Sequence, residues 1–258
     1  MKNFLISGLR GNIGQNLKQI LNSRGIRFYD YEKSKTKNFN RFVHLAAKHP
    51  IHTNKEIINS NIVYLNEIIN NFDWKSKDLI FISTVSVYNT KKKIINEGCT
   101  LQEKGIYPLS KIIGEDLILK SKINSLVLRV SGIISLKKSY SFLSKILDQL
   151  YADNDIYLSN GKSKFNSFLD PFDLSNFIIS QKRIKKFDIV NLSAPYTHSL
   201  LDIVNMFKEA LRSSSKIHNK EFNQKIPKVD IAKATKYYNF NPSSIIDTVD
   251  RITNKFIK

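Results

Sequence analysis

The sequence predicts an α/β protein with a doubly wound parallel sheet, followed by a smaller and less regular C-terminal lobe. Short apolar runs, such as Phe4-Leu5-Ile6 and Leu79-Ile80-Phe81-Ile82, indicate buried strands. Segments with apolar residues at helical spacing follow these runs, and this alternation is typical of parallel sheets. A loop with three glycines joins the first strand to the first helix.

The first half of the chain accounts for most of the expected sheet. Strands are predicted at Lys2–Ser7, Ile26–Tyr29, Arg41–Leu45, Asp78–Ser83 and Ser125–Val130. Helices are predicted from Ile13 to Gly25, at Glu56–Phe72 and from Tyr107 to Ser121. Residues 31–40 are too few for an ordinary crossover, so the helix there is expected to be very short or missing.

The C-terminal half has a weaker pattern. Helices are predicted at Ser139–Tyr151, Asp173–Lys182, Ser199–Leu211, Ile231–Tyr238 and Ser244–Phe256. Two further strands are expected at Asp155–Leu158 and Phe187–Leu192.

Composition narrows the class of protein. The chain has 258 residues, 41% of them hydrophobic, which is enough for a full core. Cys99 is its single cysteine, so no internal disulfide is possible and a reducing cytoplasm is expected. The apolar run Phe4-Leu5-Ile6 is too short for a signal-peptide core, and no run approaches the ~18 residues of a membrane span. No membrane partner is expected.

The formal net charge of +19 invites comparison with nucleic-acid-binding proteins. The lysines are spread along the chain, and no nucleic-acid-binding module is recognisable, so a solvated basic surface and no nucleic-acid partner are expected. The three histidines His44, His49 and His52 lack metal-ligand spacing, and no cysteine or acidic cluster accompanies them. No metal site is predicted.

The glycine-rich loop has the context of a dinucleotide site. Gly8, Gly11 and Gly14 lie between a predicted strand and a predicted helix, where they permit a tight turn and close approach of a pyrophosphate. The start of that helix supplies free N–H groups to the same anion. This Rossmann-type pattern predicts a cofactor site formed by residues of the loop: Gly8, Arg10, Gly11, Asn12, Ile13 and Gly14.

The choice between NAD and NADP stays open. Asp30 follows the second strand, where an acid accepts hydrogen bonds from the adenosine ribose and favours NAD. Arg10 favours NADP, because a guanidinium in the glycine loop could hold a 2′-phosphate.

Tyr107 and Lys111 are the predicted catalytic pair. Residues four apart lie on one face of a helix, and Pro108 suits a helix start. A nearby ammonium favours the phenolate, so Lys111 is expected to lower the pKa of Tyr107. Thr84 and Ser86 come at the carboxyl end of the fourth strand, where hydroxyls could meet a carbonyl.

These motifs, in this order, resemble the extended short-chain dehydrogenases/reductases, which include nucleotide-sugar epimerases, dehydratases and ketoreductases. The matching segments run through the whole chain: the glycine loop, Phe42-Val43-His44-Leu45-Ala46-Ala47, Asn61-Ile62, Ser83-Thr84-Val85-Ser86-Val87-Tyr88, Tyr107-Pro108-Leu109-Ser110-Lys111-Ile112-Ile113-Gly114-Glu115, Leu128-Arg129 and Phe168-Leu169-Asp170-Pro171-Phe172-Asp173-Leu174. The resemblance implies Thr84, Tyr107 and Lys111 as catalytic residues. It adds Leu45, Ala46, Ala47 and Asn61 to the cofactor site, which Tyr107 and Lys111 share.

The resemblance also implies a domain division and a partner. Residues 1–135 would form the dinucleotide-binding domain, joined by later segments at about 160–195, and 136–258 would be mainly a substrate-binding lobe. A homodimer is expected through the helices Glu56–Phe72 and Pro108–Ser121. Candidate contacts to a nucleotide-sugar substrate are Lys48, Ser86, Ser131 and Lys164.

Departures from the family pattern reduce the number of reactions expected for this chain. Val85 and Ser86 follow Thr84 where dehydratases have an acidic pair, which argues against dehydration. The resulting hypothesis is an NAD(P)-dependent reductase of a keto group, at the 4-position, of a nucleotide-linked deoxy-sugar. Two alternatives stay open: an epimerase that uses the same residues, and a dinucleotide-binding regulatory protein without catalysis.

Overall fold

The structure is a computed structural model, which describes residues 3–34, 36, 38–89, 92–102, 104–135, 140–222, 226–254 and 256. The predicted element starts at Lys2 and Ser139 lie outside the described residues, as do the domain limits 1, 136 and 258.

The chain divides into two compact units, each with its own hydrophobic core. The first unit comprises Met1–Asn89, Glu97–Val130 and Leu174–Asn191. The second comprises Thr90–Asn96, Ser131–Asp173 and Leu192–Lys258.

The first unit is built on a six-stranded sheet in the order β10-β6-β4-β3-β1-β2. The strands are β1 (Phe4–Ser7), β2 (Phe28–Asp30), β3 (Arg41–His44), β4 (Asp78–Thr84), β6 (Ser125–Val130) and β10 (Asp188–Leu192). Neighbours from β2 to β6 pair in parallel, which confirms the predicted fold class. From β1 the chain goes to β2 on one side and then to β3 on the other, so the loop after β1 lies at the switch point where such sheets bind ligands.

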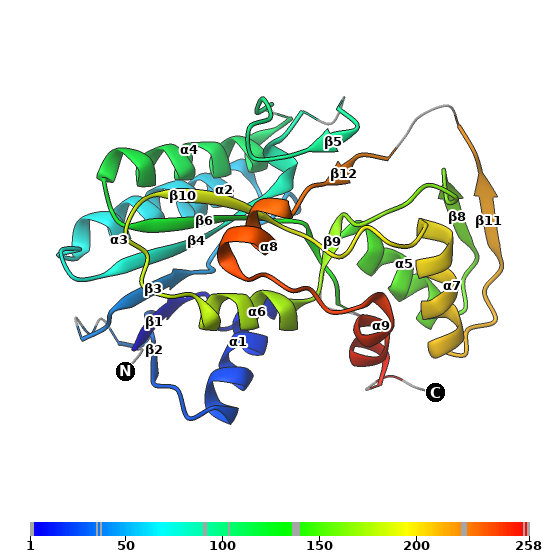
Figure 1. The fold of residues 1–258 in the computed structure, drawn as a ribbon, viewed down its shortest axis with the longest axis horizontal. Coiled ribbons are helices and arrows are strands. Elements are labelled where there is room, and N and C mark those ends of the chain that lie inside the picture. Colours follow the sequence, from blue (N-terminus) through cyan, green and yellow to red (C-terminus); the bar gives the residue numbers. More distant parts are fainter. Residues whose placement is uncertain are drawn as a thin grey trace. The chain divides into compact units, whose positions relative to one another are not determined.

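Helices cover both faces of this sheet (Figure 1). One face carries α1 (Asn12–Ser23) and α6 (Pro171–Ser180), and the other carries α2 (Asn54–Ile58), α3 (Tyr64–Asn71) and α4 (Ile106–Ser121). The single helix predicted at 56–72 is interrupted by the π-helical turn Asn59–Val63. A capping box formed by Thr53 and Glu56 fixes the start of α2.

The stretch between β2 and β3 contains no helix among its described residues, as predicted from its length. Aromatic side chains pack there instead. The rings of Phe39 and Phe72 meet edge to face with centroids 4.9 Å apart, and Tyr31 packs on Phe42 at 5.2 Å. These bulky rings provide apolar cover that a crossover helix would otherwise supply.

A buried ion pair fastens α6 to the sheet. Arg41 of β3 pairs with Asp78 of β4 at 2.6 Å, and both side chains are buried. The same guanidinium donates to the carbonyl oxygens of Gln181 and Lys182, just beyond the end of α6. Because the pair is also hydrogen-bonded to backbone, the cost of burying its charges is offset.

The second unit is assembled from segments distant in sequence. Its helices are α5 (Phe142–Tyr151), α7 (Leu200–Ala210), α8 (Ala232–Tyr238) and α9 (Ile245–Thr253). Its strands pair as β8 (Ile156–Ser159) with β11 (Ile217–Lys220), β7 (Gly132–Ile133) with β9 (Phe168–Leu169), and β5 (Ile94–Ile95) with β12 (Lys228–Val229). The resemblance implied a strand-to-helix segment at Phe168–Leu174, where β9 and α6 lie, whereas β5, β7 and β12 were not predicted, since two residues are too short to show a period of two.

No helix within the described ranges is both long enough and apolar enough to cross a bilayer.

Candidate functional site

The carboxyl end of β4 brings together the three predicted catalytic residues. Thr84 is the last residue of β4, and its side chain hydrogen-bonds to the phenol of Tyr107. Tyr107 and Lys111 lie on the first turns of α4, which begins after Gly105. Thr84 and Lys111 are buried, and Tyr107 is partly buried.

Lys111 is turned toward the strand. Its Nζ donates to the carbonyl oxygen of Ile82 at 2.9 Å and lies 4.9 Å from the centroid of the Phe81 ring. Burial lowers the pKa of Lys111 to about 8, and the carboxylate of Glu115 opposes this shift.

The pKa of Tyr107 differs from the sequence-based expectation. Burial raises it to about 12, while the hydrogen bond from Thr84 acts in the opposite direction. The expected fall is not found, because burial is the larger effect on the phenol. The phenol is therefore protonated at neutral pH, as a proton donor must be.

Glu115 is a buried acid that was not assigned to the site from the sequence. It lies four residues after Lys111, on the same face of α4. It accepts a hydrogen bond from Ser83 Oγ and pairs with Arg129 Nη2 of β6 at 2.5 Å. The i+4 spacing from Lys111 was the available signal.

The hydrogen-bonded chain continues past Arg129. Its Nη1 donates to the hydroxyl of Tyr88 at 2.9 Å, and that hydroxyl donates to Asn191 Oδ1 at 2.7 Å. The Arg129 guanidinium also lies 4.8 Å from the centroid of the Tyr88 ring. Tyr88 is fully buried, and burial raises its pKa to about 12.

At two of the three glycines of the loop, a larger side chain would clash with the backbone. Gly8 has a φ of +78°, and a Cβ there would meet Ala46 N at 2.6 Å. A Cβ on Gly14 would meet the backbone of Gly8 and lie 2.5 Å from Leu9 Cα. At Gly11 the nearest atom would be Gly8 O at an ordinary 3.4 Å. The fold itself requires glycine at the first and third positions, whereas Gly11 is exposed.

The loop also suits a pyrophosphate. Gly11 caps α1 without a side-chain hydrogen bond, and the first turn of α1 contains no acidic residue. The free N–H groups of this turn can receive an anion. Asn12 Nδ2 is buried and has no hydrogen-bond partner. The nearby Arg10 is exposed, and Ile13 is partly buried.

A second acid follows β2 besides Asp30. Glu32 Oε1 accepts hydrogen bonds from Gly8 N–H at 3.0 Å and from the Tyr64 hydroxyl at 3.1 Å. Asp30, at the end of β2, accepts from the backbone N–H of Glu32 at 3.1 Å. The carboxylate that accepts a hydrogen bond from the glycine loop is therefore that of Glu32, not that of Asp30. The sequence offered no means of choosing between two acids two residues apart.

The other predicted cofactor residues lie after β3 and in the π-helical turn. Leu45, Ala46 and Ala47 follow β3 and are partly buried. Asn61 is buried, and its amide exchanges hydrogen bonds with the backbone of Lys48 at 2.8 and 3.1 Å. It also donates to Ser110 Oγ at 2.9 Å, and Ser110 donates to the carbonyl oxygen of Tyr107. Asn61 thus ties the loop after β3 to the first turn of α4.

The four candidate substrate contacts divide between the units. Lys48 and Ser86 belong to the first unit, where Ser86 N–H donates to Thr84 Oγ1 at 3.1 Å. Ser131 and Lys164 belong to the second. Ser131 is buried, with its hydroxyl 2.8 Å from that of Ser193. Their roles stay predictions.

The histidines take separate positions. His44 is buried, with Nδ1 2.7 Å from Ser7 Oγ, and burial lowers its pKa to about 3. His49 is exposed on the loop after β3, and its ring centroid lies 5.7 Å from that of Tyr107. Within the part of the chain that the structure describes, no group of three or more His, Cys, Asp or Glu residues could hold a metal ion.

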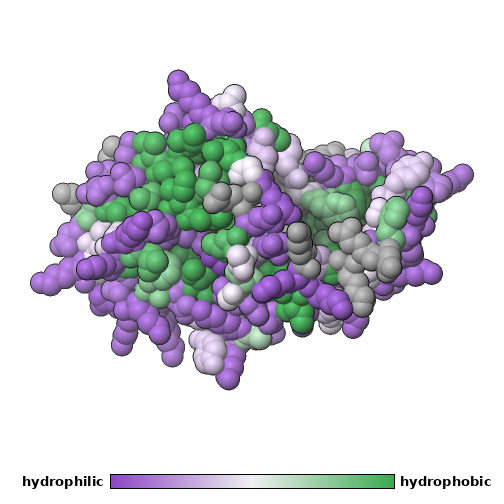
Figure 2. Space-filling view, turned by 90° about the horizontal axis from the view of Figure 1, so that it is seen from above, coloured by the Kyte–Doolittle hydropathy of each residue, from purple (hydrophilic) through white to green (hydrophobic). Residues whose placement is uncertain are grey.

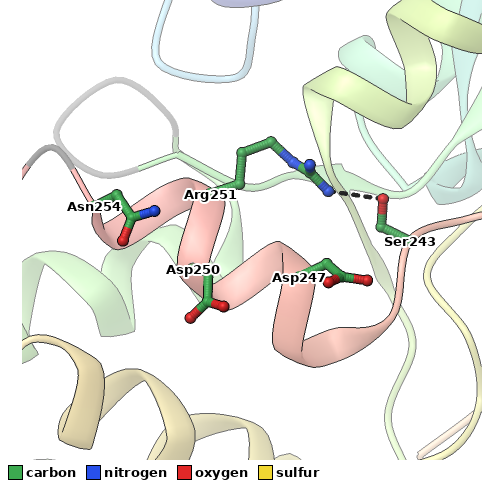
Figure 3. Close-up of a pocket in the computed structure, with 5 residues that line it drawn as sticks. All are labelled: Ser243, Asp247, Asp250, Arg251 and Asn254. Carbon is green, nitrogen blue, oxygen red and sulfur yellow. Dashed lines mark hydrogen bonds between the residues drawn. The ribbon is translucent and has the colours of Figure 1, made fainter.

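A pocket of about 340 Å³ lies on the second unit, along α9. The residues that line it are Ser243, Asp247, Asp250, Arg251 and Asn254 (Figure 3). Arg251 turns its guanidinium toward Ser243 at 2.7 Å and pairs with the buried Asp170, also at 2.7 Å. Because its cation is already paired, we assign no function to this pocket.

No family model matches the chain, and no curated protein matches its sequence. Solved structures do match it over nearly their whole length. UDP-glucuronic acid 4-epimerase from Bacillus cereus, in complex with UDP-glucuronic acid and NAD, is 18% identical with a TM-score of 0.78, covering 99% of this chain and 98% of that chain. RMD from Pseudomonas aeruginosa, complexed with NADPH, is 14% identical with a TM-score of 0.81, covering 100% of both chains.

A third match is a short-chain dehydrogenase/reductase superfamily protein from Agrobacterium tumefaciens with bound NAD. It is 14% identical with a TM-score of 0.78, covering 98% of this chain and 96% of that chain. The chain has the short-chain dehydrogenase/reductase fold. The fold implied by the sequence motifs is thereby confirmed.

The first prediction for this short-chain dehydrogenase/reductase fold concerns its glycine loop. Gly14→Ala should lower the free energy of unfolding by about 1–3 kcal/mol, because the new methyl group meets rigid backbone. Gly11→Ala is the matched control and should lower it by about 1 kcal/mol or less, since its methyl group meets ordinary contacts and only the preference for glycine at the cap of α1 is lost. Urea denaturation measures both. Equal losses in the two variants would contradict the steric assignment.

The second prediction concerns the charge of Lys111. Its pKa is about 8 in the folded chain and near its usual 10.5 when unfolded, so between these values the unfolded chain binds the extra proton. The stability of the wild type relative to Lys111→Met should therefore rise as pH rises from 8 to 10.5, and fall as pH is lowered again. Denaturation of both proteins across this range measures the difference. A difference independent of pH would contradict the shifted pKa.

Proposed function

We propose that this chain is an NAD(P)-dependent oxidoreductase that reduces a keto group, at the 4-position, of a nucleotide-linked deoxy-sugar. The observation that carries this proposal is the convergence of Thr84, Tyr107 and Lys111 at the carboxyl end of β4. Ligands of open α/β sheets bind at that edge.

The three side chains have separate tasks in this reaction. The nicotinamide would supply hydride to the carbonyl carbon. Tyr107, protonated at neutral pH, donates its proton to the oxygen that becomes negative. Thr84, already hydrogen-bonded to the phenol, stabilises the charge on that oxygen. The ammonium of Lys111 stabilises the phenolate left after proton transfer.

The glycine loop supports the cofactor assignment. Gly8 and Gly14 keep the loop against the sheet, and the exposed Gly11 leaves space for a pyrophosphate at the start of α1. The acids Asp30 and Glu32 after β2 favour NAD, since either carboxylate can bind a ribose hydroxyl. Arg10 favours NADP, and structures of similar proteins contain either NAD or NADPH. We keep both cofactors.

The substrate class is proposed from the resemblance and from the neighbours. One structurally similar protein is an epimerase in complex with UDP-glucuronic acid. Thr84 is followed by Val85 and Ser86, and neither provides the acid or base that dehydration of a sugar needs. Reduction would need the hydride of the nicotinamide and no side chain beyond the three catalytic residues. Lys48, Ser86, Ser131 and Lys164 are the proposed substrate contacts.

Epimerisation is the second candidate, since 4-epimerases are among the structurally similar proteins. An epimerase would use the same phenol and ammonium to oxidise and then re-reduce one carbon. The two reactions differ in their net use of the cofactor. A reductase consumes added NAD(P)H when it converts a keto-sugar, whereas an epimerase converts its substrate without net consumption of NAD(P)H.

We further propose a homodimer formed through the helices of one sheet face. Figure 2 shows hydrophobic residues gathered over α2–α4. Large apolar side chains there are exposed, among them Ile58, Val63 and Leu119 at 38%, 45% and 52%. A contiguous apolar surface of this kind is typical of protein interfaces.

The third prediction tests the proton donor. Tyr107→Phe should lower turnover by about 10²–10⁴-fold, because that is the usual contribution of general acid catalysis and the ring otherwise keeps its packing. Binding of NAD(P)H, followed by cofactor fluorescence, should be nearly unchanged. Tyr157→Phe makes the same change at an exposed ring of the second unit and serves as the matched control, with turnover unchanged. Undiminished turnover in Tyr107→Phe would contradict the proposed role.

The fourth prediction tests the dimer. Val63→Glu places a charge on the exposed apolar face and should weaken self-association at least tenfold, because a carboxylate would be buried without a partner. Tyr157→Glu is the control, since Tyr157 is 76% exposed on β8 of the second unit. Sedimentation equilibrium measures the association. A wild type that is monomeric at all concentrations, or a Val63→Glu variant as dimeric as the control, would refute the interface.

A further inference from the structure

One face of α4 meets three consecutive residues at the end of β4. Tyr107, Lys111 and Glu115 are spaced by four and therefore lie along one side of the helix. Their partners on the strand are, respectively, the side chain of Thr84, the carbonyl oxygen of Ile82 and the hydroxyl of Ser83. Glu115 thus lies in one row with the two catalytic side chains of α4, and all three contact β4.

Glu115 is the most firmly held member of this row. Its side chain is 5% exposed, and Arg129 contacts both carboxylate oxygens, with Nε at 3.1 and 3.2 Å and Nη2 at 2.5 Å. Arg129 of β6 is the register partner of Ser83 on β4. Side chains of two adjacent strands therefore bind one carboxylate and attach this turn of the helix to the sheet.

The partner of Glu115 is itself fixed. Arg129 is 3% exposed, and Tyr88 holds its remaining side through the hydroxyl at 2.9 Å and the ring at 4.8 Å. Replacing a buried ion pair by apolar residues of similar volume is often neutral or stabilising. Stability alone therefore does not explain why charges are buried directly behind the catalytic pair.

We propose that Glu115 is a positioning residue that holds Lys111 and Tyr107 against the end of β4 and keeps a negative charge beside the Lys111 ammonium. Its catalytic consequence rests on the proposed function, whereas the placement of Lys111 does not. Lys111 is otherwise faced by titratable groups that supply no anion: the neutral His44 of β3, His49 of the following loop, and the protonated Tyr107. Glu115 is faced by the cations of Lys111 and Arg129.

Removal of the carboxylate should weaken the hold of Lys111 on its proton. Burial lowers the pKa of Lys111 to about 8, and Glu115 is the group that opposes this shift. In Glu115→Gln, the midpoint at which Lys111 loses its proton should fall by at least about one pH unit, a tenfold change in the proton-binding constant. If the reductase assignment is right, the pH at which turnover declines should move down with it.

The test is an NMR titration of the full chain labelled with ¹⁵N-lysine. Comparison with Lys111→Arg identifies the Lys111 signal. Asp116→Asn is the matched control, because Asp116 is the next residue of α4 but lies exposed in a pair with Lys120. It removes one carboxylate from the same helix turn and should leave the Lys111 midpoint unchanged.

Glu115→Gln leaves the charge of Arg129 buried without its partner, which can prevent folding. The double variant Glu115→Gln/Arg129→Met removes both charges and should fold with a Lys111 midpoint below that of the wild type. Glu115→Asp should restore much of the wild-type midpoint, since the carboxylate is retained.

An unchanged Lys111 midpoint in folded Glu115→Gln and in the double variant would overturn the proposal. So would an equal shift in Asp116→Asn. If the midpoint falls as expected but the wild type reduces no keto-sugar with NAD(P)H, the positioning of Lys111 is supported and the proposed reaction is refuted.

Discussion

The docking of α4 on the end of β4 is the contact on which the candidate site depends. Every fourth residue of the helix hydrogen-bonds to the strand, twice to a hydroxyl and once to a backbone carbonyl. Gly114 allows this approach, because a Cβ there would lie 2.9 Å from the Phe81 ring and 3.1 Å from Leu65. The same close packing of α4 on β4 therefore forms part of the core and places the reactive groups.

Burial gives the site its protonation state. The removal of water raises the pKa of Tyr107 and lowers that of Lys111 and of His44. In each case burial penalises the charged form. Glu115 acts against this trend at Lys111 alone, so the site combines a protonated phenol with an ammonium that titrates near pH 8. Such an arrangement is prepared to give a proton and then to stabilise the resulting phenolate.

The glycine loop shows a second way in which backbone geometry prepares a site. Gly8 and Gly14 are required by close contacts within the protein, whereas Gly11 is not. The loop consequently keeps its shape through contacts with the strand and with itself. Its outer surface, with the free N–H groups at the start of α1, can meet an anion.

The sequence by itself determined most strands and helices of the first unit, and it predicted the three residues that meet at the end of β4. Buried parallel strands are continuous apolar runs, and helices repeat every 3.6 residues, so both leave a local pattern. The missing helix between β2 and β3 was also readable, because it follows from length alone. Tyr107 and Lys111 could be grouped because they share one face of a recognisable helix, and the resemblance to a known family added Thr84 at the end of a recognisable strand.

Only the tertiary structure decided which carboxylates matter and what they do. Glu32 rather than Asp30 bonds to the glycine loop, and Glu115 meets Arg129 across two strands. The direction of the Tyr107 pKa shift depended on the burial of the phenol, and the π-helical turn brought Asn61 to Ser110. These contacts join residues far apart in the chain, and their side-chain directions and burial leave no periodic signal in the sequence.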